Sequence, residues 1–140
     1  MTNYEYTHSA ETTATTQAVW DLWRDVSRWT EWDSSLESVT LEGPFAVGSS
    51  GTMVIPGQRP IAFTLTDVRP GLGFTDETSI PGALLRFDHA VEALGDGRAR
   101  VTHRVVIEGP VAQELGPVVT EDVPEAVAAL VTLAEASSAA

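Results

Sequence analysis

The stretch GFTDETSIPGALLRFDHAVEALGDGRARVTHRVVIEGP, residues 73–110, decides the fold. It contains three segments in which side chains alternate in character, and each segment ends at a turn rich in Gly, Pro or Asp. Alternation with a period of two is typical of strands with one buried face, and short Gly/Pro turns join antiparallel neighbours. The stretch therefore predicts three consecutive antiparallel strands, over residues 73–80, 84–94 and 98–108.

The turn between the last two strands determines their register. A tight turn at Gly95-Asp96-Gly97 most simply pairs Leu94 with Arg98, which places His89 opposite His103 and Phe87 opposite Val105. The face that carries these residues is otherwise apolar, whereas the other face is polar or charged: Arg86, Asp88, Glu92, Arg100, Thr102 and Arg104. Because a slip of one residue buries those charges, both histidines are predicted to face the interior.

The Pro81-Gly82 turn extends the register by one strand. It pairs Ile80 with Ala83, and this pairing places Phe74 opposite His89 and Asp76 opposite Phe87. Asp76 is then predicted either on the inner face beside the histidines or at the rim of the sheet in water.

The rest of the chain supplies further strands and helices. Alternating or apolar segments bounded by turns predict strands over residues 4–12, 37–41, 50–55 and 60–68. Apolar residues at helical spacing predict a helix over 16–26, capped at Thr15 or Thr16, and a short helical turn through Trp29 and Trp32. Residues 111–120 are mixed and broken at Gly116-Pro117, and an amphipathic helix of about four turns follows from Asp122.

Composition limits the possible functions. The 140 residues carry a net charge of −12, all eight basic residues are Arg, and there is no Cys. An acidic surface disfavours nucleic acid and anionic membranes as partners, and the lack of Lys and Cys removes Schiff-base and thiolate chemistry. No apolar run is long enough to span a membrane, and the N-terminal residues lack the features of a secretory signal, so a cytoplasmic protein is expected. No repeat or linker divides the chain, which predicts one domain over residues 1–140, as a monomer or homodimer.

Three local sequences accompany this order of elements. They are VWDLWRDVSRWTEW at 19–32, FAVGSSG at 45–51, and THR at 102–104 with Gly109-Pro110 and the segment 130–135. Together they resemble the START-like superfamily in its polyketide cyclase/dehydrase branch. The resemblance implies an α+β helix-grip fold, in which a curved seven-stranded antiparallel sheet wraps a long C-terminal helix, with two short helices after the first strand. It also implies a ligand-sized cavity, but no invariant catalytic residue.

Strand alternation and the helix stripe predict which residues line this cavity. The ring-bearing and aliphatic side chains that are expected to contact a ligand are Trp29, Trp32, Met53, Phe63, Leu65, Phe74, Phe87, Val105, Val123 and Val127. Trp29 and Trp32 are placed near the mouth. A mostly apolar pocket with a few polar groups is typical of a small-molecule site.

Asp76, His89 and His103 are the polar groups among this apolar lining. The two imidazoles are candidate acid and base groups, with Asp76 as the carboxylate that orients one of them. They are equally consistent with a ligand lining that does no chemistry, or with histidines hydrogen-bonded within the core. No metal is expected, because no supporting residues accompany these three, and no cofactor motif occurs.

Three functions remain open. The first is binding of a small hydrophobic, aromatic or polyketide-like ligand, which a solidly packed interior would contradict. The second is an aromatase/cyclase that catalyses aldol cyclisation and dehydration of a polyketide. The third is a chaperone-type interaction module, which requires an exposed apolar patch.

Overall fold

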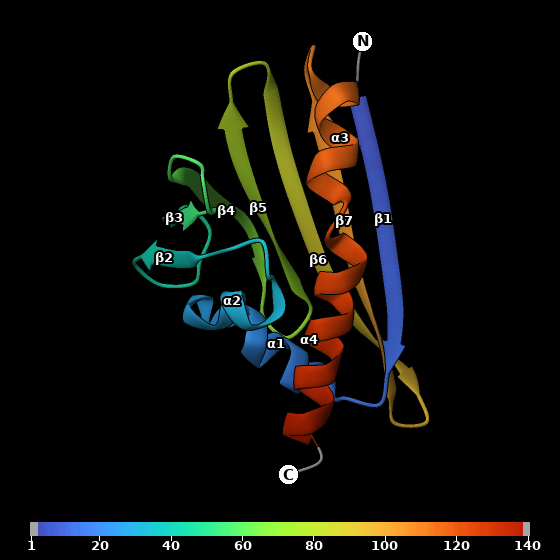
Figure 1. The fold of residues 1–140 in the computed structure, drawn as a ribbon. Helices are drawn as coiled ribbons and strands as arrows, with labels where there is room; N and C mark the ends of the chain where they lie inside the picture. The colour runs from blue at the N-terminus through green and yellow to red at the C-terminus, as the bar shows by residue number, and fades with distance from the viewer. Residues whose placement is uncertain (1–2, 139–140) are drawn as a thin grey trace.

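Seven antiparallel strands form one sheet in the order β1-β7-β6-β5-β4-β3-β2. In the computed structural model, which describes residues 3–138, the strands are β1 (Asn3–Thr12), β2 (Ser38–Glu42), β3 (Ser50–Val54), β4 (Ile61–Arg69), β5 (Gly73–Ile80), β6 (Ala83–Gly95) and β7 (Arg98–Glu108). The helical segments are α1 (Thr16–Arg24), the 3-10 turn η1 (Val26–Arg28), α2 (Trp29–Trp32), α3 (Ala112–Thr120) and α4 (Val123–Ser138). All of the α-helices lie on one side of the curved sheet (Figure 1). The predicted α+β helix-grip architecture is confirmed.

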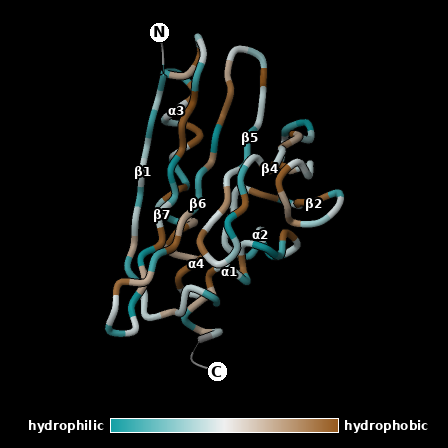
Figure 2. The backbone as a smooth tube through the Cα atoms, turned by 180° about the vertical axis from the view of Figure 1, so that it is seen from behind, coloured by the Kyte–Doolittle hydropathy of each residue, from teal (hydrophilic) through white to brown (hydrophobic). Residues whose placement is uncertain are grey.

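The registers derived from the turns are confirmed where they concern the interior. His89 pairs with His103 and Phe87 with Val105, while Phe74 pairs with His89 and Asp76 with Phe87. The pairing of Leu94 with Arg98 is wrong, because a bulge between Ala93 and Gly95 lets Gly95 pair with Arg98 instead. The bulge absorbs one residue at the turn and leaves the inward register of β6 unchanged. Hydrophilic and hydrophobic residues accordingly alternate along the strands (Figure 2).

Two helical segments differ from the sequence-based prediction. The first helix stops at Arg24, because the side chain of Asp25 accepts a hydrogen bond from the backbone N–H of Ser27 and starts η1. The segment read as broken at Gly116-Pro117 is the continuous helix α3, with Pro117 inside it. Gly116 is packed directly against the ring of Tyr4 on β1, and the Tyr4 hydroxyl lies 3.2 Å from Thr120 Oγ1. Packing against β1 therefore holds a helix that local propensity disfavours.

Two clusters of apolar side chains fill the space between the sheet and the helices. The larger cluster lies under α1, α2 and α4 and includes Trp23, Trp29, Trp32, Phe63 and Phe74. The smaller one lies under α3 and includes Leu85, Val105, Ile107 and Ala112. Val123 at the start of α4 packs against both clusters. No helix in the described part of the chain is long and apolar enough to cross a membrane.

Candidate functional site

A band of polar side chains crosses the concave face of the sheet between the two apolar clusters. Thr78 and Asp76 project from β5, His89 from β6 and His103 from β7, and all four side chains are buried. Strand alternation places the four on one face, because Phe74, Asp76 and Thr78 follow at steps of two. The sequence therefore builds a polar strip into an otherwise apolar interior.

One row of this band contains three histidines. His8 on β1 pairs with His103 on β7, which pairs with His89 on β6, which in turn pairs with Phe74 on β5. His8 is half-buried and was not among the predicted site residues. Its alternation within β1 could be read from the sequence, but its partner could not. β1 reaches β7 from the far end of the chain, and no short turn fixes that register.

The two buried imidazoles are packed among aromatic rings. His89 stacks on Phe74 with ring centroids 4.0 Å apart, and the centroid of His103 lies 4.7 Å from that of His89 and 5.8 Å from that of Trp32. Nδ1 of His89 donates to the backbone carbonyl of Phe74 at 3.3 Å, which leaves its Nε2 as an acceptor. His103 Nε2 is buried without a hydrogen-bond partner among the described residues.

Burial keeps both imidazoles uncharged. Desolvation lowers the pKa of His89 to about 4, against the weaker opposing effect of the Phe74 carbonyl. The pKa of His103 also falls well below its ordinary value, through desolvation and then through the nearby His89 and His8. Neutral imidazoles with such low pKa values are weak bases at neutral pH.

Asp76 lies inside the protein and not at the rim of the sheet. Its side chain is 3% exposed, and Oδ1 has no hydrogen-bond partner among residues 3–138. Burial, together with the charges of Asp88, Asp33 and Glu77, raises its pKa to about 8. Asp76 is therefore a neutral carboxylic acid at pH 7, close to the pH at which it could give up a proton.

The expected partnership between Asp76 and a histidine is not observed. Asp76 lies in the row of Phe87 and Val105, next to the histidine row, and the proton of His89 Nδ1 goes to a carbonyl. A carboxylate beside an imidazole raises its pKa, whereas the pKa values of both imidazoles are lowered. No hydrogen bond joins Asp76 to either imidazole in the described part of the chain, and the role of Asp76 in orienting one of them stays a prediction.

Next to Asp76 on the same face, Thr78 was not predicted as a site residue. Its side chain is 3% exposed, and Oγ1 is buried without a partner in the described part of the chain. The signal was present in the sequence, because Thr78 follows Asp76 by two residues on a strand with a fixed register. Two oxygens without hydrogen-bond partners, Asp76 Oδ1 and Thr78 Oγ1, therefore lie on neighbouring inward-facing positions of β5.

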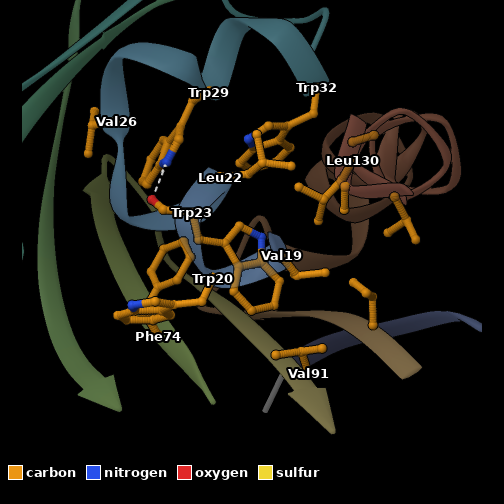
Figure 3. Close-up of a cluster of buried hydrophobic side chains, with 14 of the residues drawn as sticks. Val19, Trp20, Leu22, Trp23, Val26, Trp29, Trp32, Phe74, Val91 and Leu130 are labelled. Atoms are coloured by element: carbon orange, nitrogen blue, oxygen red, sulfur yellow. Dashed lines mark hydrogen bonds between the residues drawn. The ribbon is translucent and has the colours of Figure 1, made fainter. Parts of the chain in front are cut away.

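Most of the predicted lining forms a closed core. Trp29, Trp32, Phe63, Leu65, Phe74, Val105 and Val127 are buried against one another or their neighbours, whereas Met53, Phe87 and Val123 are half-buried. Trp29 and Trp32 do not border a mouth: Trp29 donates from Nε1 to the carbonyl of Trp23 at 2.7 Å, and Leu130 from α4 lies beside Trp32 (Figure 3). The helical spacing of the tryptophans places them in the core.

Two hollows of the described chain lie outside this band. One, of about 390 Å³, runs between η1 and β2 and is lined by Val26, Val39, Leu41 and Phe45 among others. The other, of about 280 Å³, lies between α1 and the end of α4. Neither is lined by Asp76, His89 or His103. The packed interior counts against a preformed cavity at the band, and a ligand could reach the band only by displacing side chains that now fill the interior.

Comparison with known families identifies the chain. The model of the family described as polyketide cyclase/dehydrase and lipid transport matches residues 4–135. The chain belongs to this family. A search of curated protein sequences finds no match.

Solved structures share the fold of this polyketide cyclase/dehydrase family member at low sequence identity. The Zhui aromatase/cyclase from Streptomyces sp. R1128 matches with a TM-score of 0.79 and 13% identity, over 96% of this chain and 94% of that one. Truncated norcoclaurine synthase from Thalictrum flavum gives a TM-score of 0.75 and 13% identity over 94% and 93% of the two chains. Ara h 8.0201 gives 0.74 and 12% identity over 92% and 95%. At such identities the likeness establishes the fold and assigns no residue a role.

Within residues 3–138 of this family member, no three His, Asp or Glu side chains are grouped as metal ligands would be. The chemistry available in the polar band is thus that of a neutral acid, a hydroxyl and two neutral imidazoles. These groups can donate or accept hydrogen bonds, and Asp76 can exchange a proton near neutral pH.

Proposed function

We propose that this protein binds a small, mainly aromatic molecule against the concave face of the sheet, with Asp76 and Thr78 contacting a polar group of that molecule. The observation that carries the proposal is the pair of unpartnered buried oxygens on β5, Asp76 Oδ1 and Thr78 Oγ1. Aromatic side chains lie next to them in the interior, and aromatic rings favour flat ligands through stacking.

The energetic cost of these two oxygens supports a ligand role. A buried polar group without a partner costs about 1–3 kcal/mol, and an apolar side chain at either position would avoid that cost. The other buried polar atoms without partners in the described residues belong to Trp23, Trp32 and His103, which also face this interior. A ligand with donors and acceptors would satisfy such groups on entry.

The side of the band over β5 offers the route of entry. Among the strands, α3 and α4 contact mainly β1 and β7 (Figure 1), whereas the rings of Trp23 from α1 and Trp29 from α2 pack against Phe74 on β5. Phe87 is half-buried against the smaller apolar cluster, and Val123 is half-buried against both clusters. We expect these side chains to move aside when a ligand binds.

Calorimetry and native mass spectrometry with neutral aromatic probes, starting with 2-naphthol, test the proposal. Wild-type protein is expected to bind, and the variants Asp76→Leu and Thr78→Val are each expected to bind at least about tenfold more weakly, since each removes a hydrogen bond to the ligand. Ser79→Ala is the matched control, because Ser79 follows Thr78 on β5 and is exposed. This variant should bind as wild type. Equal affinity for all four proteins, or no binding to any probe, contradicts the proposal.

An aromatase/cyclase activity is the second candidate, and the raised pKa of Asp76 is the observation that favours it. In the dehydration of a β-hydroxyketone, the carboxylic acid would protonate the departing hydroxyl, so that the C–O bond breaks and water leaves. The resulting carboxylate would then take the proton from the α-carbon as the C=C bond forms, which restores the acid. Turnover of a poly-β-ketone surrogate should be abolished in Asp76→Asn. If His89→Ala or His103→Ala abolishes it while Asp76→Asn does not, the imidazoles carry the chemistry instead.

The remaining expectations have less support. An interaction module calls for an exposed apolar patch, but the large apolar side chains exposed in residues 3–138 are Val47, Leu72, Leu94 and Val118, from four separate parts of the chain. We further propose a cytoplasmic monomer or homodimer, and the acidic charge of −12 supports the absence of a nucleic-acid partner.

A further inference from the structure

Four carboxyl groups extend from the surface to the buried oxygens on β5. Asp122 and Glu125 are exposed at the start of α4, Asp33 is half-buried directly after α2, and Asp76 is buried on β5. Asp122 and Glu125 act electrostatically on Asp33, and Asp33 acts on Asp76. Ordered by burial, the four groups form a series from the exposed Asp122 and Glu125 through Asp33 to Asp76.

The series has no positive side chain paired with it. Seven of the eight arginines form ion pairs, and their partners are Asp21, Glu31, Asp67, Glu77, Glu11, Glu92, Glu5 and Asp88. None of the ion pairs found in residues 3–138 involves Asp33, Asp76, Asp122 or Glu125. In an acidic chain whose arginines are otherwise engaged, negative potential concentrates where no arginine is present.

Local contacts hold Asp33 in place at the middle of the series. Its Oδ1 accepts hydrogen bonds from the backbone N–H of Ser35 at 3.1 Å and from Ser35 Oγ at 2.6 Å. Even so, burial and the charges of Asp122 and Glu125 raise its pKa. The carboxylate is thus fixed in position, and no ion pair among residues 3–138 compensates its charge.

The inner end of the series carries a separate indication of a ligand. Thr78 Oγ1 and Asp76 Oδ1 are unpartnered, and both side chains are 3% exposed on the same face of β5. Acidic clusters at a surface are commonly satisfied by water. Here the series ends on buried oxygens that lack any partner in the described part of the chain, which a solvated cluster does not explain.

We infer that the polar group recognised at Asp76 and Thr78 is a cation, a protonated amine on a small aromatic molecule, drawn inward along Asp122, Glu125, Asp33 and Asp76. This inference rests on the proposed ligand-binding function and specifies its ligand class. The ammonium group supplies the donors that Asp76 Oδ1 and Thr78 Oγ1 lack, and it offsets the repulsion among the carboxylates.

Two probes that differ by an ammonium group test the inference. Tyramine and 4-ethylphenol share the phenol ring and the two-carbon chain, and only tyramine carries the amine. Calorimetry at pH 7 should show wild-type protein binding tyramine at least about tenfold more tightly, the effect of a charge-assisted hydrogen bond. The preference should disappear in Asp76→Asn, shrink in Asp33→Asn, and persist in Asp67→Asn, whose exposed carboxylate pairs with Arg69.

Proton release provides a readout that loss of packing would not change. Asp76 is neutral at pH 7 and ionises beside an ammonium group, so tyramine binding should release up to one proton, measured as a dependence of the binding enthalpy on the ionisation heat of the buffer. Asp88 and Glu77 also act on Asp76, but both are engaged by Arg104 and Arg86. Asp76→Asn should therefore remove the release, and 4-ethylphenol should cause none.

The possible outcomes distinguish failure of the cationic ligand from failure of the proposed ligand-binding function. Equal affinity for the two probes, or a preference that survives Asp76→Asn, overturns the cation while leaving a neutral aromatic ligand in place. Failure of both probes and of 2-naphthol to bind overturns the ligand-binding function as well.

Discussion

Asp76 is a buried carboxyl group whose pKa is raised close to neutral pH. It sits two residues from Phe74 and two from Thr78 on a face that is otherwise apolar or aromatic, and its ordinary pKa of 3.8 rises to about 8. The sequence predicts its inward direction through the Pro81-Gly82 turn. The depth of its burial could not be predicted, because that depends on loop residues such as Asp33 and on α2, which no register ties to β5.

The raised pKa of Asp76 predicts a pH-dependent stability. An unfolded Asp releases its proton near pH 4, whereas the folded group keeps it up to about pH 8, so the folded state binds more protons between these values and its stability falls as pH rises through them. Asp76→Asn cannot ionise. In urea unfolding, the variant and wild type should agree within about 1 kcal/mol at pH 4, where the unfolded Asp is still largely protonated, and the variant should be more stable by more than about 2 kcal/mol at pH 9.

Asp67→Asn provides the control for that experiment, since its carboxylate is exposed and paired with Arg69. Its stability should run parallel to that of wild type across the pH range. Parallel curves for Asp76→Asn as well would show that Asp76 ionises normally in the folded protein.

Among the elements, tight turns explain what the sequence predicts well. Phe74, His89 and His103 were aligned correctly because each strand pair is joined by a short turn that leaves one register. His8 joins the same row through β1 and β7, which are far apart in sequence, so the third histidine was missed. The same non-local packing decides α3, where Gly116 and Pro117 indicate a break but Tyr4 of β1 supports a helix.

The close approach of α3 to β1 predicts a clash for Gly116→Ala. A Cβ atom at this position would lie 2.3 Å from Cγ of Tyr4, which is backed by β1 and cannot swing aside freely. Alanine favours the helix by about 1 kcal/mol over glycine, but overpacking costs about 1–3 kcal/mol, so the free energy of unfolding should fall by up to about 2 kcal/mol. Thermal unfolding measures the loss.

Two further variants define the cause of that loss. Val118→Ala lies on the same helix at a position that is 68% exposed, and it should change stability by less than about 0.5 kcal/mol. Gly116→Ala combined with Tyr4→Ala should show a favourable coupling, because the second change opens space for the new methyl group. Simple additivity of the two losses would place the strain elsewhere than at the Tyr4 ring.

The whole molecule combines a closed, aromatic interior with a large excess of negative charge. The charge of −12 was known from composition, but its arrangement was not: arginines pair across neighbouring strands on the convex face, as Arg104 does with Glu5 and Asp88. Asp33, Asp122 and Glu125 form no such ion pair among residues 3–138. Charge and composition alone therefore indicate a well-solvated acidic surface. The structure further separates the convex face, where carboxylates pair with arginines, from Asp33, Asp122 and Glu125, which form no ion pair in the described part of the chain.

This distribution predicts opposite effects of salt on stability and on ligand binding. Screening weakens repulsion among unpaired carboxylates more than it weakens exposed ion pairs, each worth about 0–1 kcal/mol, so raising NaCl from 0.05 to about 0.5 M should stabilise the free protein. A gain of about 1 kcal/mol in unfolding free energy would appear as about 2–4 °C in Tm. The same screening shields Asp122, Glu125 and Asp33 from an incoming amine, so tyramine affinity should fall over that range while 4-ethylphenol affinity stays constant. A Tm that falls with salt would mean that the ion pairs on the convex face dominate the electrostatics. A salt-independent tyramine affinity would mean that Asp122, Glu125 and Asp33 do not attract the ligand.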